Sequence, residues 1–333
     1  MSDLQLTWFL LVGVLFAGYS LLDGIDCGVG TLLLGRRRDE RERQVVLGSV
    51  GPATFGNEFW LVAGVAALFT AFPPVRSTVL SAFGPVLGIL ALVLVLRAAT
   101  LGSGRSSEGA GRPESRDVAF GVLCVLAAFL PGVVLGNVLR GLPLDVDGAY
   151  AGSPAGLLNS FSLVVGLEVV AVFLLQGACW LNLRAGETLG ESTQETALRA
   201  WITVVAIHGL TGLLSLWAAP HLWKSYHHPL TWIAPVAMLV ALVAVPFLVK
   251  AGRATGALLA SSTVIAALWG IVGQGLYPRI VPALGDAGHG LTVANASATP
   301  TVLTSLLVVL IAVLTLVAGY SVFVFLRFRR PVA

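Results

Sequence analysis

Long apolar runs dominate this chain, and most are near the roughly 20 residues that a helix needs to cross a bilayer. Hydrophobic residues make up 56% of the 333 and charged residues only 11%, against roughly 25% charged residues in a soluble protein. This composition excludes a soluble enzyme with a single anchor. We therefore expect an all-α, polytopic membrane protein whose residues 1–333 form a single transmembrane domain. About nine transmembrane helices are predicted, at residues 6–33, 55–73, 76–98, 117–139, 156–183, 198–219, 229–250, 254–276 and 301–327.

The positions of the lysines and arginines predict how the chain crosses the membrane. With the N-terminus outside, four of the 20 Lys and Arg residues fall in outside segments, namely Arg76, Arg140, Lys224 and Arg279. The others, Arg97 among them, fall on the cytoplasmic side. This bias satisfies the positive-inside rule, so we expect the N-terminus outside and the C-terminus in the cytoplasm. The net charge is only +3 and gives no reason to expect nucleic acid as a partner.

Two acidic residues, Asp23 and Asp26, interrupt the first apolar segment, where a charged group is costly. They are three residues apart and share a face of the expected helix. Gly24, Gly28 and Gly30 lie beside them and allow another helix to approach closely. Two interpretations have about equal support. The pair is a proton relay or a polar contact with a cofactor-bearing partner, or it is a pair of hydrogen-bonded acids that holds helices together.

Two further acids lie in later segments. Glu58 opens the second segment at its cytoplasmic side, where it complements the helix dipole or forms the mouth of a proton path. Glu168 lies in the middle of the fifth segment, with no charged residue within one helical turn. We expect it to be protonated, to face the interior of the bundle and to hydrogen-bond a neighbouring helix. Gln176, about two turns further on, extends this polar stripe or makes a structural hydrogen bond.

Residues that could bind a haem or a metal are scarce inside the predicted helices. His208 is the one histidine in a predicted span, and Met238 is the one internal methionine. Haem iron is usually held by His, Met or Cys, so the chain could not easily hold several haems, and His208 is more simply a core histidine than a ligand. The three cysteines are far apart and are interpreted as small core residues. No P-loop is present, which excludes an ATPase acting alone.

Several motifs, taken together, resemble those of subunit II of the cytochrome bd-type quinol oxidases. Leu22–Gly30 (LDGIDCGVG) is similar to LDGFDxGVG of that family. Gly51-Pro52, Gly56–Leu61 (GNEFWL) and Ala71–Pro73 are similar to GPxWDGNEVWL followed by AFP. Later matches are Gly136-Asn137, Arg140–Pro143, Leu157–Asn159, Gln176–Ala178, Gly275–Pro282, Leu291–Val293, Asn295–Ser297 and Thr299-Pro300. The order and spacing follow the family pattern along nearly the whole chain, as do nine helices with the N-terminus outside.

The resemblance implies a haem-free subunit II of a multi-pass quinol oxidase complex in the bacterial cytoplasmic membrane. Its partner would be a homologous subunit I that carries two haems b and one haem d, and the complex would oxidise quinol and reduce dioxygen to water. Subunit II would hold no cofactor, metal or catalytic residue of its own. It would support the complex and conduct protons from the cytoplasm. The family pattern leaves open a small single-span subunit and a bound lipid or quinone.

One departure from the family pattern falls on the expected proton path. The family's Trp-Asp before Gly-Asn-Glu is Thr54-Phe55 here, and that aspartate is the proposed entry point for protons. Phe55 cannot carry a proton, so Glu58 is the nearest replacement. Glu168 stands where the family pattern leads us to expect a small or apolar residue, and it could compensate in a different route. The predicted proton path is drawn from Glu58, Asp26, Asp23 and Glu168.

Two other functions stay open from the sequence. A proton-coupled multi-span transporter could use the same acids, with Glu168 at its substrate site. Transporters often contain internal repeats, and the two halves of this chain show no clear repeat. A purely structural scaffold for the haem-bearing subunit would need no proton path at all.

Overall fold

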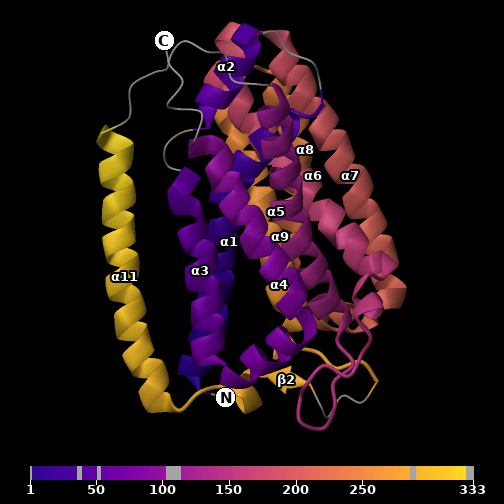
Figure 1. Cartoon of the computed structure of the whole chain (residues 1–333). Coiled ribbons are helices and arrows are strands. Elements are labelled where there is room, and N and C mark those ends of the chain that lie inside the picture. The colour runs from indigo at the N-terminus through magenta and orange to yellow at the C-terminus, as the bar shows by residue number, and fades with distance from the viewer. Residues whose placement is uncertain (1, 36–39, 51–53, 103–113, 286–289, 328–333) are drawn as a thin grey trace.

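Helices form nearly all of the computed structural model of this 333-residue chain, and they stand side by side as one bundle (Figure 1). The structure describes residues 2–35, 40–50, 54–102, 114–285 and 290–327. Within these ranges each predicted apolar segment corresponds to one long helix, so the prediction of an all-α membrane protein is confirmed. The long helices are α1 (Asp3–Leu32), α3 (Thr54–Ala71), α4 (Pro73–Gly102), α5 (Glu114–Arg140), α6 (Ser160–Leu189), α7 (Glu191–Ala218), α8 (Ile233–Lys250), α9 (Ala254–Leu276) and α11 (Pro300–Arg327).

Several helices begin at other residues than the predicted apolar spans. The start predicted at 156 falls in the 3-10 turn η1 (Pro154–Leu157), and α6 begins four residues later, where the Asn159 side chain accepts a hydrogen bond from the Ser162 amide. The start predicted at 229 falls in a second turn, η3 (Pro229–Trp232). Proline opens both turns because its fixed φ suits a first helical position. In the other direction, α7 begins seven residues before the predicted 198, since a helix continues through polar residues that hydropathy excludes.

Seven helices in the described part of the chain are long and apolar enough to cross a membrane. The other two, α3 and α11, contribute shorter apolar stretches, Gly56–Ala71 and Pro300–Val313. The total of nine crossings and the orientation of the two termini therefore stay predictions. In Figure 1, α1 begins at the end of the bundle marked N, and α11 runs from that end to the opposite one. An odd number of crossings requires this arrangement.

The centre of the bundle is built on α1 and α6, which pack against each other and both contact α5 and α9. Glycine makes this approach possible. A Cβ on Gly28 would overlap the Phe173 carbonyl oxygen, and a Cβ on Gly177 would overlap the backbone of Gly28. Small residues let membrane helices approach closely, as the sequence predicts for Gly28. The three cysteines are buried and unpaired, in agreement with their interpretation as core residues.

Short elements lie at both ends of the bundle. At the end opposite to N in Figure 1, α2 (Glu40–Ser49) lies against α6, where Trp180 Nε1 donates to the Ser49 carbonyl at 3.1 Å. At the other end, the amide of Leu142 donates to the Pro282 carbonyl at 2.9 Å, which joins the α5–α6 connection to the α9–α11 connection. The remaining elements are η2 (Pro220–His227), the antiparallel strands β1 (Arg279–Val281) and β2 (Leu291–Thr292), and α10 (Val293–Ala296).

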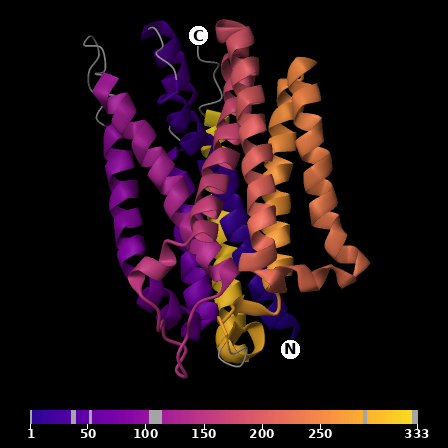
Figure 2. The same ribbon diagram turned by 90° about the vertical axis from the view of Figure 1, so that its right-hand side faces the viewer.

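The last helix, α11, stands apart from its neighbours in Figure 1, and in Figure 2 it lies behind the other helices. Its first turns are attached to α1, where Trp8 Nε1 donates to the Leu303 carbonyl at 3.0 Å. Further along, Val308, Val309 and Ile311 are exposed. In a membrane such an apolar surface faces lipid or another helix, because both keep its side chains away from water.

Candidate functional site

The two aspartates predicted as a site lie in the second half of α1 and are buried. Asp23 has no exposed surface, and Asp26 is 6% exposed. The adjacent part of α1 packs tightly on α6, because a Cβ on Gly24 would already lie 3.1 Å from the Phe173 ring. Burial of a charged group is costly unless it is paired and hydrogen-bonded. Each carboxylate therefore needs a partner from within the protein.

Arg97 of α4 supplies that partner for Asp23. Its Nη2 lies 2.7 Å from Asp23 Oδ1 and its Nη1 lies 2.9 Å from Asp23 Oδ2, which makes a two-pronged pair. The same Nη2 lies 2.9 Å from Oε1 of Glu58 on α3. The Arg97 side chain is 1% exposed and that of Glu58 is 23% exposed, so these groups run from the interior towards the edge of the bundle. We call Asp23, Arg97 and Glu58 the acid–arginine triad.

Two more groups of α1 border the triad. The Cys27 thiol donates to Asp23 Oδ2 at 3.3 Å and accepts from Arg97 Nη1 at 2.6 Å. Asp26 Oδ2 accepts a hydrogen bond of 2.6 Å from Asn57 Nδ2, on the residue next to the α3 member of the triad. The two aspartates therefore contact different helices, Asp23 reaching α4 and Asp26 reaching α3. The structure brings three of the four predicted path residues together.

The charges of the triad do not balance. Two carboxylates share one guanidinium, so the three groups carry one excess negative charge when both acids are ionised. An excess charge in a low-dielectric interior is costly, and one bound proton removes it. Asp23 is held by two guanidinium nitrogens and Glu58 by one, so the contact of Arg97 with Glu58 is the weaker one. The triad therefore joins two acids to one cation, and Glu58 is the more exposed of the two acids.

Glu168 does not belong to this cluster. It lies in α6, where its Oε1 is 2.6 Å from Nδ1 of His208 in α7. The predicted hydrogen bond to a neighbouring helix is confirmed, and its partner is the one histidine of the predicted spans. Gln176 of the same helix bonds instead to Ser261 and Ser262 of α9. Because Glu168 and Gln176 face different helices, they do not form one polar stripe.

Arg97 is a residue of the site that the sequence alone did not identify. The charge count places it on the cytoplasmic side, but α4 continues to Gly102 and buries its side chain. Arg97 lies within the predicted span 76–98, and Leu101 beyond it is the signal that the helix continues past that span. The helix-dipole interpretation of Glu58 also loses support, because Glu58 is the fifth residue of α3 and pairs with Arg97.

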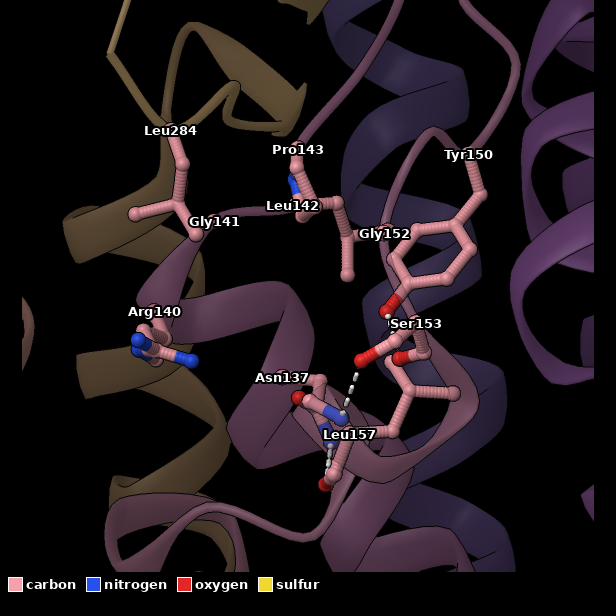
Figure 3. Close-up of a pocket in the computed structure, with 11 residues that line it drawn as sticks. Asn137, Arg140, Gly141, Leu142, Pro143, Tyr150, Gly152, Ser153, Leu157 and Leu284 are labelled. Atoms are coloured by element: carbon pink, nitrogen blue, oxygen red, sulfur yellow. Dashed lines mark hydrogen bonds between the residues drawn. The ribbon is translucent and has the colours of Figure 1, made fainter.

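A separate cavity of about 210 Å³ lies beside the C-terminal end of α5 and the loop that follows it (Figure 3). Its lining combines apolar side chains such as Leu142 with Arg140 and Tyr150. The Tyr150 hydroxyl donates to the Ser153 carbonyl at 2.8 Å. Burial raises the pKa of Tyr150, and the positive charge of Arg140 partly offsets this rise. The cavity is lined by none of the predicted path residues, so it is distinct from the triad.

The described ranges contain no group of three or more His, Cys, Asp and Glu side chains placed to hold a metal ion.

The sequence matches a known family over almost its full length. The model of the family described as cytochrome bd terminal oxidase subunit II matches residues 4–328. The chain belongs to this family. The motifs that resemble cytochrome bd subunit II, from Leu22 to Pro300, all lie inside the matched region.

Relatives in two bacteria carry the same family name. The cytochrome bd-I ubiquinol oxidase subunit 2 of Escherichia coli strain K12 is 26% identical over 351 residues, which cover 95% of this chain and 93% of that protein. The cytochrome bd ubiquinol oxidase subunit 2 of Bacillus subtilis strain 168 is 27% identical over 350 residues, which cover 100% of this chain and 98% of that protein. By these names, both relatives are subunits of oxidoreductase complexes.

The fold of this cytochrome bd subunit II family member agrees with a solved structure. A chain in the structure of bd oxidase from Geobacillus thermodenitrificans superposes with a TM-score of 0.78 at 17% identity, covering 98% of both chains. At this low identity, the likeness supports the arrangement of the helices and nothing finer. The family match and the apolar helices together show a multi-pass membrane protein.

The departure from the family pattern at Thr54-Phe55 falls on side chains outside the described part of the chain, and residues 51–53 lie wholly outside it. The next turn of α3 is described. There Asn57 contacts Asp26, and Glu58 contacts Arg97. Glu58 is thus the first acid of α3 whose contacts the structure describes.

Proposed function

We propose that this chain is the haem-free subunit II of a cytochrome bd-type quinol:dioxygen oxidoreductase in the bacterial cytoplasmic membrane. Its E. coli and B. subtilis relatives are named as subunits of ubiquinol oxidases, which supports a complex with a homologous subunit I. That partner would carry haem b and haem d, and quinol would supply the electrons. Reduction of dioxygen to water consumes protons together with electrons, so such a complex needs a proton supply.

The acid–arginine triad is the observation that carries a role in proton delivery. Glu58 is partly exposed and Asp23 is completely buried, and both contact the same Arg97 nitrogen at 2.9 and 2.7 Å. A proton that binds to Glu58 cancels the excess negative charge of the triad, so its binding there is favourable. Asp26, held by Asn57, adds a second buried acid beside this place. The path we propose therefore runs from Glu58 inward to Asp23 and Asp26.

Arg97 has a positioning role in this path. Its guanidinium holds both carboxylates and keeps a positive charge next to them, which lowers the cost of ionising them between successive protons. Glu168 lies outside the path, because it bonds to His208 at the contact of α6 with α7. We assign Glu168 to that contact.

The test is quinol-driven oxygen uptake by the purified complex carrying Glu58→Gln or Asp26→Asn. Each substitution keeps the size of the side chain and removes the acid. Turnover is expected to fall on the order of tenfold or more, while haem absorbance per protein stays unchanged. Glu195→Gln is the matched control, because Glu195 forms an exposed ion pair with Arg199, and it should leave turnover at the wild-type value.

Each alternative function gives a different result. Unchanged turnover of both variants at full haem content would reject proton delivery and favour the scaffold. Loss of haem together with turnover would make these acids structural. Copurification of a second multi-span subunit with b- and d-type absorbance bands supports the oxidase. A colourless chain that purifies alone and takes up protons with a substrate would be a transporter.

A further inference from the structure

Tyr19 places a buried hydroxyl one turn beyond the triad. It lies four residues before Asp23 in α1, so the two side chains share a face of the helix at a rise of about 6 Å. Tyr19 is 4% exposed. Since α1 runs from Asp3 to Leu32, Tyr19 is near the midpoint of this helix, whereas Asp23 is nearer the end that leads to α2. Tyr19 is therefore deeper in the membrane than the triad.

The Tyr19 hydroxyl is buried and has no hydrogen-bond partner among the described residues. Asp23 acts on the hydroxyl through its charge and as a side-chain hydrogen-bond acceptor, and Cys27 and Arg97 act on it through charge. The hydroxyl is therefore next to the triad, although its contact with Asp23 lies outside ordinary hydrogen-bond geometry. Buried polar atoms are almost always bonded, and an exception needs an explanation. Packing does not explain the hydroxyl, because phenylalanine would fill the same space without burying an unpaired polar atom.

We propose that the Tyr19 hydroxyl is the exit of the proton path, taking protons from the triad and passing them to water in the interior of the bundle. This inference rests on the proposed function of the triad. In each transfer, the phenol oxygen takes a proton from the protonated carboxyl group as it releases its own proton to the next water. One O–H bond forms and one breaks at the phenol, so no charge stays on Tyr19. The transfer needs the Tyr19 oxygen within hydrogen-bond distance of the Asp23 carboxyl group, which a small movement of either side chain achieves.

The test is Tyr19→Phe in the purified two-subunit complex. We expect turnover to fall on the order of tenfold, the KM for quinol to stay unchanged and the ratio of rates in H₂O and D₂O to rise. Thermal stability should stay the same or increase, because the substitution removes an unpaired buried hydroxyl. Tyr226→Phe is the matched control, since Tyr226 lies in η2 beyond the end of α7, and it should change neither rate nor isotope ratio.

Glu58→Gln, assayed in parallel, separates this inference from the function it rests on. A slow Glu58→Gln complex with a wild-type rate for Tyr19→Phe overturns the exit role and leaves proton delivery through the triad intact. A wild-type rate for Glu58→Gln overturns proton delivery, and the exit role falls with it. A Tyr19→Phe complex that loses haem or unfolds at a lower temperature makes the hydroxyl structural and also overturns the exit role.

Discussion

Arg97 makes three contacts with carboxylate oxygens in the described part of the chain, two with Asp23 and one with Glu58. All of these contacts lie in the space between α1, α3 and α4. Removing one partner of a buried ion pair leaves the other charge without compensation, which is more damaging than replacing the whole pair by apolar groups. The stability of the site therefore depends on this arginine more than on either acid alone.

We predict that Arg97→Gln lowers the free energy of unfolding by about 3–5 kcal/mol, because Asp23 stays buried without its partner. The measurement is denaturant titration of the purified complex, followed by the haem spectrum. Arg199→Gln is the control, since it breaks an exposed pair with Glu195 and should cost less than about 1 kcal/mol. Similar losses for the two substitutions would contradict the special position of Arg97.

We predict that His221 makes stability fall in mild acid. Burial lowers the pKa of His221, and the positive charges of Arg279 and Lys224 lower it further. Between the folded pKa and the unfolded value of about 6.5, the unfolded chain binds more protons, so stability is lost as the pH falls through this window. Thermal midpoints measured at pH values from about 7.5 to about 5 should decrease, and less steeply for His221→Gln. Parallel curves would exclude this role of His221.

The acids of the site could be predicted, but their partners could not. Asp23, Asp26 and Glu58 stand out because charged residues are rare in apolar segments. Arg97 lies next to the end of the predicted span 76–98 and therefore counts among the cytoplasmic charges, whereas α4 continues to Gly102 and its side chain is buried. The partner of Glu168 is hidden for another reason. His208 lies 40 residues away, and only the crossing of α6 and α7 brings the two side chains together.

Hydropathy predicts the existence of the helices better than their ends. The apolar segment 254–276 coincides with α9, which is bounded by Arg253 and by the turn at Tyr277. Hydropathy could not predict that α7 starts at Glu191, because the helix includes polar residues that lie outside the apolar span. The packing of α1 on α6 could be anticipated in part. The glycines of α1 indicate a close contact, but they do not identify Gly177 as the opposite surface.

We predict that Gly28→Leu separates α1 from α6. The new side chain would overlap the Phe173 carbonyl and Gly177, and overpacking of this kind typically costs about 1–3 kcal/mol or more. The expected result is a lower thermal midpoint and a lower yield of haem-loaded complex. Gly13→Leu is the control on the same helix, because no other described part of the protein comes within 4 Å of a Cβ at Gly13. A wild-type midpoint for Gly28→Leu would contradict the close packing.

The molecule as a unit has one property that its fold alone does not reveal, namely which end faces the cytoplasm. The native cysteines are buried, so a membrane-impermeant thiol reagent should label introduced cysteines selectively. We predict that Asp147→Cys, between α5 and α6, is labelled in intact cells. Arg253→Cys, between α8 and α9, should be labelled only after the cells are opened. The reverse pattern would show that the N-terminus is in the cytoplasm.

The spacing of Asp23 and Tyr19 along α1 has an electrical consequence. A proton that moves between them crosses about 6 Å of a hydrocarbon core about 30 Å thick, or about one-fifth of it. A potential of 100 mV acts on such a step with about 0.5 kcal/mol, which corresponds to about a twofold change in rate. With the cytoplasm negative and the N-terminus outside, the proton moves against the field. A strongly energised membrane would then slow the proton supply of the complex that helps to energise it.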